Sequence, residues 1–371
     1  MDLNFGINGS IAVEAARPVL VDSTTPIGVV VPFQSETALT YYDNATAWLD
    51  YLKTQGAATS DLAYRTANAI KLQGVNTKII VQYVDGTDEA KILAGLDGLQ
   101  SAPYDERVLD RPDLVIVPEY SYSTAVAAKM DAVASKLRAT AIVDVNAPDE
   151  AAATGFAANF GSRFLLLYRG QTRIENALYP TSAVMAGVIA YWDGGGDNGF
   201  DEFGYARSHS NRIAKGVHGS EVPIEYFDGQ DCEARRLRQK GVGAIVQDVG
   251  WRTYGFETTD IDPIWQSLER VRTFYRWLDA IMKENKWARD RSADQLIWVK
   301  KTASEFFRKL TGAGISLGYR IELDADRSDV VAGKFTFVIH VENMPPIREL
   351  NFILTFTDEY NDAFIEWVNN Q

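Results

Sequence analysis

KFTFVIHV, residues 334–341, is the stretch that decides the fold of this 371-residue chain. Its apolar side chains recur at every second position, which predicts a strand with one apolar face. They are Phe335, Phe337, Ile339 and Val341. Met344, Pro345 and Pro346 follow, and proline interrupts a strand because it has no backbone N–H to donate.

A second alternation, LNFILTFT, occupies residues 350–357 and places Leu350, Phe352, Leu354 and Phe356 on one face. No Asn-Gly or Asp-Gly turn joins it to the first strand, so a tight hairpin is not indicated. Ordering eight residues costs about 1–2 kcal/mol each, whereas a ladder hydrogen bond returns about 1 kcal/mol. The segment therefore needs apolar burial, either in its own core or in the sheet of a neighbouring molecule.

The composition indicates a soluble globular protein of two or three domains, with 46% apolar and 23% charged residues. Fifty acidic and 37 basic residues give a net charge of −13, which argues against general binding to nucleic acid or anionic lipid. The single cysteine, Cys232, excludes an internal disulfide and a cysteine metal cluster. We expect neither a secretion signal nor membrane insertion, because no suitable apolar run occurs.

A weaker alternation near the N-terminus, residues 6–15, predicts another strand that contains Ile7, Ile11 and Val13. Pro18 and Pro26 separate it from the apolar run 27–33, which predicts a buried strand. The first strand is therefore a candidate for a second arm.

Between residues 45 and 168, predicted helices alternate with predicted strands. The helices are 45–55, 62–72, 88–99, 123–137 and 149–160, and the strands are 78–84, 113–118, 139–145 and 163–168. Apolar strands between amphipathic helices predict a mostly parallel sheet covered on both faces. The loops contain no Gly-x-Gly-x-x-Gly or Gly-Lys-Ser/Thr motif, so phosphate binding has no support.

The polar motifs that follow do not predict chemistry. The loop 193–202 has glycines and carboxylates, but its spacing misses the EF-hand pattern, and a solvated turn is the favoured interpretation over a cation site. Ser208 and His209 are adjacent, but no orienting carboxylate is placed by a recognisable motif. His340 is expected at a surface or interface, and Cys232 in helix packing.

The C-terminal half begins with a charged helix at 233–240, a strand at 244–247 and an aromatic turn at 250–255. Pro263 is expected to open a long helix to about residue 286, and residues 292–310 form another. That last helix carries Lys301, Arg308 and Lys309 opposite its apolar stripe, with Lys300 at the margin. A basic face on an acidic protein is either a binding surface or a plain solvated face.

The order of these segments resembles the tail sheath proteins of contractile phage tails, particularly the P2-like group, to which sheaths of R-type bacteriocins and type VI secretion are related. The similar stretches are 23–31, 179–190, SHSNRIAKGVHG at 208–219, 240–255 with GWRTYG, 263–290 with Arg270, Arg272 and Trp287, 306–318 and 333–360. The chain departs from the family pattern in the loop 193–202 and in an added segment at 362–368.

The resemblance implies an α/β (α+β overall) fold with arms that exchange strands between subunits. It implies an N-terminal arm (1–22), a discontinuous inner core (23–80 and 210–348) with a mixed sheet completed by neighbouring subunits, an inserted outer α/β domain (81–209) and a C-terminal arm (349–371). In such a family the tube contact is a basic helix, and Lys300, Lys301, Arg308 and Lys309 fall in the matching segment. The arm residues would be Ile7, Ile11, Val13, Leu350, Phe352, Leu354 and Phe356.

By the same resemblance, the function expected is that of a structural sheath subunit that forms stacked six-fold rings and contracts, with no cofactor and no enzymatic activity. The implied partners are further copies of the chain, a tail tube protein, and baseplate and tail terminator proteins, in a virion tail assembled in the bacterial cytoplasm. Two other functions stay open. They are the sheath of a bacteriocin or other injection system, and, from a different class, a soluble α/β enzyme or ligand-binding domain.

Overall fold

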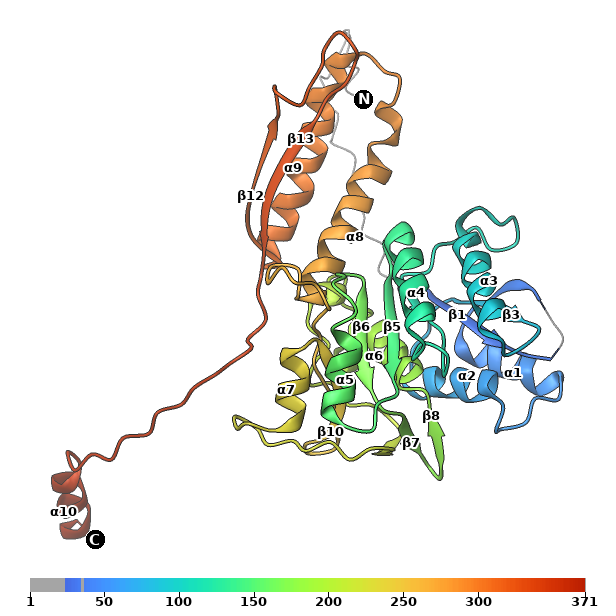
Figure 1. Cartoon of the computed structure of the whole chain (residues 1–371). Helices are drawn as coiled ribbons and strands as arrows, with labels where there is room; N and C mark the ends of the chain where they lie inside the picture. The colour runs from blue at the N-terminus through green and yellow to red at the C-terminus, as the bar shows by residue number, and fades with distance from the viewer. Residues whose placement is uncertain (1–23, 35–36, 371) are drawn as a thin grey trace, which may run out of the picture.

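The computed structural model describes residues 24–34 and 37–370, which form a body, a unit that projects from it and an extended C-terminal arm (Figure 1). The strand predicted at 6–15, with Ile7, Ile11 and Val13, lies outside the described residues. No helix in the described part of the chain is both long and apolar enough to cross a membrane.

An eight-stranded mixed sheet is the centre of the body, with strand order β11-β10-β6-β5-β4-β1-β3-β2. The six inner strands run parallel and are β1 (Ile27–Pro32), β3 (Ile79–Val84), β4 (Leu114–Ile116), β5 (Thr140–Val145), β6 (Leu165–Arg169) and β10 (Val242–Gln247). The two edge strands, β2 (Leu39–Tyr42) and β11 (Trp251–Tyr254), are antiparallel to their neighbours. The inner strands are mostly apolar because helices cover both faces of the sheet.

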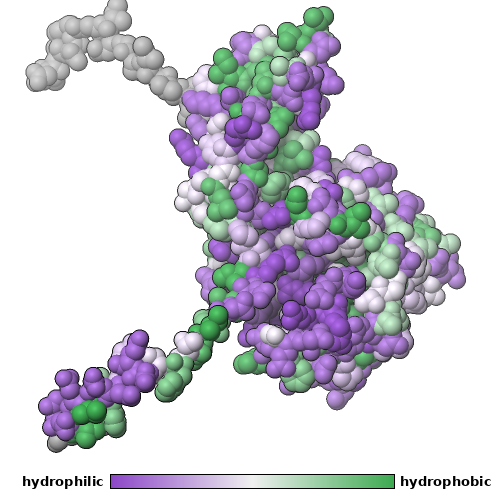
Figure 2. All heavy atoms as spheres, turned by 60° about the vertical axis from the view of Figure 1, so that its left-hand side comes forward, coloured by the Kyte–Doolittle hydropathy of each residue, from purple (hydrophilic) through white to green (hydrophobic). Residues whose placement is uncertain are grey.

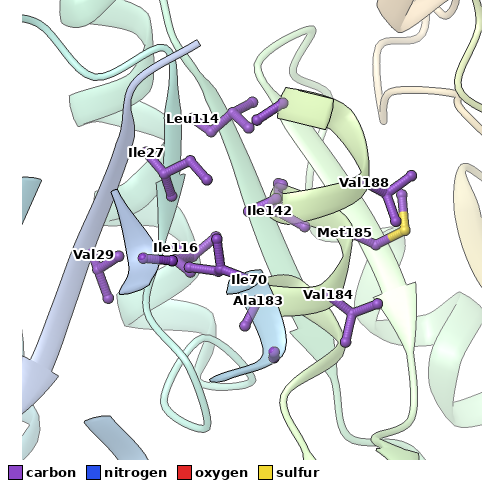
Figure 3. Close-up of a cluster of buried hydrophobic side chains, with 14 of the residues drawn as sticks. Ile27, Val29, Ile70, Leu114, Ile116, Ile142, Ala183, Val184, Met185 and Val188 are labelled. Atoms are coloured by element: carbon purple, nitrogen blue, oxygen red, sulfur yellow. The ribbon is translucent and has the colours of Figure 1, made fainter. Parts of the chain in front are cut away.

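Two groups of helices cover the sheet. One face packs against α1 (Ala45–Thr54), α2 (Leu62–Leu72) and α6 (Thr181–Asp193), and the other against α3 (Glu89–Gln100), α4 (Thr124–Leu137), α5 (Glu150–Ala157) and α7 (Glu233–Gln239). Figure 3 shows the first layer, where Ile70 of α2 and Met185 of α6 meet Ile116 and Ile142 of the sheet. Small residues such as Ala183 and Gly187 let α6 lie close to its neighbours: a Cβ at Gly187 would lie 3.2 Å from the Ile70 backbone.

Smaller elements complete the body. A three-stranded sheet has the order β8-β7-β9 and consists of β7 (Thr172–Ile174), β8 (Ala177–Tyr179) and β9 (Val217–Ser220). The body also has the short 3-10 turns η1 (Ala102–Tyr104), η2 (Gly196–Asn198) and η3 (Gly204–Ala206), whereas η4 (Lys286–Ala288) and η5 (Ala293–Gln295) lie between α8 and α9.

The projecting unit consists of α8 (Leu268–Glu284), α9 (Leu296–Gly312) and an antiparallel hairpin of β12 (Ser316–Leu323) and β13 (Phe337–Asn343). Its own core contains Trp277 of α8 and Phe306, Phe307 and Leu310 of α9, against which Ile339 and the other inward residues of β13 pack. The first turn of α8 instead contributes to the body core through Leu268 and Val271. One helix therefore belongs to both cores and joins the two units.

The predicted α/β fold is confirmed, and most predicted elements match the observed ones within a few residues. The long helix begins at Leu268 and not at Pro263, because residues 257 and 267 pair as an isolated bridge and Trp265 sits in a turn that bonds Asp262. Strands from both predicted domains share the central sheet, and residue 80 lies within β3. The strand predicted at 350–357 is extended but forms no ladder among the described residues.

Candidate subunit interface

The C-terminal arm, residues 344–370, leaves the projecting unit and runs away from the body (Figure 1). Its alternating residues Phe352, Leu354 and Phe356 are 79, 93 and 96% exposed. Figure 2 shows this part of the arm as an apolar, green stretch beside a largely hydrophilic face of the body. An exposed run of large apolar side chains marks a surface that another molecule covers.

Two polar contacts hold the root of the arm. Arg270 Nε donates to Asn343 Oδ1 at 2.9 Å, and Arg348 Nη1 donates to Glu257 Oε1 at 2.8 Å. Glu269 is buried between these contacts, and burial raises the pKa of its carboxyl to about 7, against the opposing effect of the Arg348 charge. Beyond Arg348, the arm residues 349–370 are all exposed.

A groove beside β13 is the surface in this fold that matches an extended apolar strand. It has a volume of about 300 Å³, and its lining is mainly apolar, with Trp265, Phe274, Leu278, Ile281, Ile339 and Val341. Among the described residues β12 is the only strand that pairs with β13, so the backbone groups along the other edge of β13 are available to a further strand. An apolar groove and an unpaired strand edge are the two features that strand addition requires.

The four predicted tube-contact cations all lie on α9. Lys300 and Arg308 are exposed, and Lys301 is half-buried with its ammonium 5.0 Å from the centre of the Trp298 ring. Lys309 forms an ion pair with Glu202 of the loop 193–202. Three cations therefore remain on the outer side of α9, while Lys309 is engaged within the chain.

The sequence relatives decide which family these features belong to. A putative prophage major tail sheath protein of Pseudomonas aeruginosa (strain UCBPP-PA14) is 30% identical over 373 residues, covering 93% of this chain and 94% of that protein. The chain belongs to the tail sheath protein family. The major tail sheath protein of Serratia phage KSP20 is 26% identical and covers 92% of both chains. No protein-family model matches the chain.

Solved structures show that the sheath fold extends over nearly the whole chain. A chain in the cryo-EM structure of the anti-feeding prophage baseplate has a TM-score of 0.70 at 19% identity, covering 97% of this chain and all of that one. The helical sheath of the same system in its contracted state has a TM-score of 0.67 at 18% identity, covering 95% of this chain and 99% of that one. These similarities extend the fold assignment to both the body and the projecting unit.

A buried ion network joins the projecting unit of the sheath chain to its body. Asp193, at the end of α6, is fully buried and accepts hydrogen bonds from Arg272 and Arg276 of α8, from Thr25 and from His209 Nε2 at 2.7 Å. Burial alone would raise the pKa of the Asp193 carboxyl, but Arg272, His209 and Arg276 hold it well below its usual range.

Asp113 is the second acid of the network, and its charge compensates that of Arg276. Arg276 also donates to Asp113, 2.8 Å away beside β4, and burial raises the pKa of Asp113. Burial likewise lowers the pKa of His209, so the imidazole is neutral near pH 7 and donates from Nε2. Two acids and two arginines therefore compensate each other, which is the condition for charges to be stable in a protein interior.

The middle of the loop 193–202 is exposed, which agrees with the predicted solvated turn, and each of its carboxylates also has a protein partner. Asp193 belongs to the buried network, Asp197 pairs with Lys215, Asp201 with Arg207 and Glu202 with Lys309. In the described part of the chain no group of three or more His, Cys, Asp or Glu side chains converges as metal ligands would.

His340 and Cys232, which the sequence offered as possible ligands or nucleophiles, lie in the positions expected for structural residues. His340 is exposed on β13 and lies 3.3 Å from Glu322 Oε1, in agreement with the expected surface position. Cys232 is buried beside Ala244 and Val246 at the start of α7, in agreement with the expected helix packing.

Two elements of the interface escaped the sequence analysis. Strand β12 was missed, although Tyr319, Ile321 and Leu323 alternate with Arg320 and Glu322 and would have indicated it. The C-terminal helix α10 (Asn361–Asn369) was noticed only as an added segment; its apolar residues at positions 364, 367 and 368 have helical spacing.

Proposed function

We propose that the sheath chain polymerises as stacked six-fold rings around a tail tube, and contracts to drive the tube through a bacterial envelope for genome ejection. Family membership supports a structural role in the virion tail. The observation that carries the proposal is the arm: a strand-like apolar segment that finds neither a sheet nor a core among residues 24–34 and 37–370. One copy of such a chain is incomplete.

The exchanged strand accounts for the energetics of assembly. Ordering the eight residues of the arm strand costs about 8–16 kcal/mol, which ladder hydrogen bonds of about 1 kcal/mol each do not offset. Burying Leu350, Phe352, Leu354 and Phe356 contributes about 1.5–3 kcal/mol each. Apolar burial and ladder hydrogen bonds together offset the cost of ordering the strand. We assign the groove beside β13 of a neighbouring subunit as the receiving site, because it combines apolar lining with an unpaired edge.

The domain division is proposed from the family pattern. Residues 23–80 and 210–348 would lie toward the tube, residues 81–209 outward, and residues 1–22 and 349–371 would be the exchanged arms. Because the central sheet takes strands from both sides of these boundaries, the division describes position in the sheath and not separate folding units. On this assignment α9 faces the tube, and Lys300, Lys301, Arg308 and Lys309 form weak charge pairs with it, each about 0–1 kcal/mol.

Contraction would then be a rotation of rigid subunits linked by flexible arms. The Asp193 network and α8 tie the projecting unit to the body, so that both move as one. Extended packing would be metastable, and even about a few kcal/mol per subunit, released along a long stack, supplies the work. No cofactor or enzymatic step takes part, and tube, baseplate and terminator proteins are the proposed partners.

A second candidate of the same class is the sheath of a phage-tail-like bacteriocin or another injection system. The observation in its favour is the similar fold of the anti-feeding prophage sheath. Genes for a capsid and portal beside this one would decide for a phage. The candidate from a different class, an α/β ligand-binding protein or enzyme, has no support among the sequence relatives, which are tail sheath proteins.

The test compares the full chain with a variant that lacks residues 349–371. Size-exclusion chromatography and negative-stain microscopy should show rings or tubes for the full chain and soluble monomers for the truncation, with the same thermal unfolding midpoint for the body. Polymers of sheath length from the truncated chain would contradict the arm assignment. A compact monomer from the full chain at every concentration would instead favour a binding protein or enzyme.

A further inference from the structure

The helix α10 at the end of the arm has an apolar face that none of the described residues covers. Phe364 is 64% exposed, Trp367 60% and Val368 50%, and these three residues share one side of the helix. The rings of Phe364 and Trp367 stack with centroids 6.2 Å apart. A nine-residue helix is not stable in water by its propensity alone, so this face requires a partner surface.

A cavity at the root of the arm has the matching chemistry. Its volume is about 660 Å³, and its apolar lining includes Phe160, Ala157 and the 86% exposed side chain of Ile261. Arg235 and Lys240 lie at its rim, exposed and without an ion pair among the described residues. The cavity therefore has a mixed lining, apolar around Phe160 and Ile261 and otherwise polar or charged, with these two cations at its margin.

The end of the arm has the opposite charge. Residues 349–371 contain five carboxylates, Glu349, Asp358, Glu359, Asp362 and Glu366, and no lysine or arginine. Two cations without an ion pair in the described part of the chain give this rim a local positive charge, which an acidic segment would match.

We propose that α10 of one subunit docks in this cavity of a second copy of the chain. The inference rests on the proposed strand exchange, because only three residues, 358–360, separate the arm strand from α10. A strand bound in the groove beside β13 would place the helix at one end of that groove.

The cavity adjoins the groove at its body end. Arg163 lines the groove, and its ion-pair partner Asp260, 3.1 Å away, lines the cavity. Trp265 of the groove is likewise followed directly by Gln266 of the cavity. The other end of the groove is the tip of the projecting unit, near Lys286 and Arg289, and it is the competing position for α10.

Paired cysteines distinguish the two positions in the assembled full-length chain. In a Cys232→Ser background, Val368→Cys is combined either with Ile261→Cys, in the cavity, or with Arg289→Cys, at the tip. We expect oxidation to give a ladder of disulfide-linked oligomers for the first pair and monomers for the second on a non-reducing gel. A ladder from the tip pair alone, or no ladder from the cavity pair in assembled sheaths, would overturn the docking site.

Charge exchange gives an independent test that needs no cysteine. Arg235→Glu with Lys240→Glu should raise the concentration at which half the protein sediments as polymer by about tenfold, and adding Asp362→Lys with Glu366→Lys should restore it. The matched control is Lys71→Glu with Lys136→Glu, which makes the same charge change on exposed helical positions elsewhere. An equal loss in the control, or no rescue, would count against the docking site.

The outcomes separate this inference from the proposed function. If sheaths form normally but positions 261 and 368 do not cross-link, the docking site of α10 is wrong and the proposed strand exchange is unaffected. Failure of the unmodified chain to polymerise would contradict the sheath function itself.

Discussion

The central sheet and the C-terminal arm contain similar apolar residues in opposite situations. Val115 and Leu166 of the sheet are completely buried, whereas Leu354 and Phe356 of the arm are more than nine-tenths exposed. The sheet is covered on both faces by helices of its own chain, and the arm is covered by none of the described residues. Fold stability and assembly are therefore separate properties of this chain, carried by different regions.

The projecting unit stands between these extremes. It has a core of its own around Trp277 and Phe307, yet one edge of its hairpin is unpaired and an apolar groove lies beside that edge. The projecting unit is thus stabilised by its own core, and it also offers a surface on which an exposed arm strand could be buried.

The largest effect is expected from the arm. The double change Phe352→Ala and Phe356→Ala removes two side chains that are worth about 3–6 kcal/mol together when buried. We expect the concentration needed for polymerisation to rise by at least about a hundredfold, with no change in the thermal unfolding midpoint. Sedimentation and calorimetry measure the two quantities.

The matched control, Asn351→Ala with Thr355→Ala, changes the other face of the strand and should assemble normally. A lowered unfolding midpoint in the Phe352→Ala, Phe356→Ala variant would show that the arm also contributes to fold stability.

In the body, Asp193→Asn should lower the folding stability of the chain itself. It leaves Arg272 and Arg276 buried with less compensating charge, and breaking such a pair costs about 3–5 kcal/mol of folding stability. Urea unfolding of the truncated, monomeric chain measures this cost. Asp197→Asn, which removes an exposed ion pair with Lys215 and leaves an amide oxygen to accept from Tyr191, should cost less than about 1 kcal/mol. Similar values for the two variants would show that the network does not join α8 to the body.

At the root of the arm, the pH dependence of stability tests Glu269. Its folded-state pKa of about 7 lies above its ordinary value of 4.5, so its contribution to stability is fully present below about pH 4.5 and is lost as pH rises through about 7. The loss is up to about 3 kcal/mol. Glu269→Gln should therefore be more stable than the unmodified chain at pH 8 in urea unfolding, and the difference should shrink at pH 5. Glu284→Gln, on the same helix, is the control, and an equal pH profile for all three proteins would refute the assignment.

The smallest effects are expected on α9. Reversing Lys300, Lys301 and Arg308 to Glu should reduce co-sedimentation with purified tube, because each exposed charge pair contributes about 0–1 kcal/mol, and the reduction should fade at high salt. Self-assembly without tube should change less. Lys71→Glu with Lys136→Glu controls for net charge. Equal losses in both assays would argue against a role specific to the tube.

The sequence by itself determined the alternation of helices and strands in the body. Apolar runs such as 114–117 and amphipathic helices such as 62–72 report local burial directly, because their periodicity follows from helix and strand geometry. It also determined that 350–357 needs an apolar partner, and in the structure none of the described residues provides one.

Only the tertiary structure decided which distant residues meet. Asp193 lies in a glycine-rich loop that resembled a solvated turn, and its partners Arg272, Arg276 and His209 come from segments 16–83 residues away. Likewise, no local pattern shows that β12 leaves β13 with a free edge, or that Arg163 and Asp260 connect a groove to a cavity. Periodicity records whether a side chain is buried, whereas the identity of the group that covers it depends on how the chain packs in three dimensions.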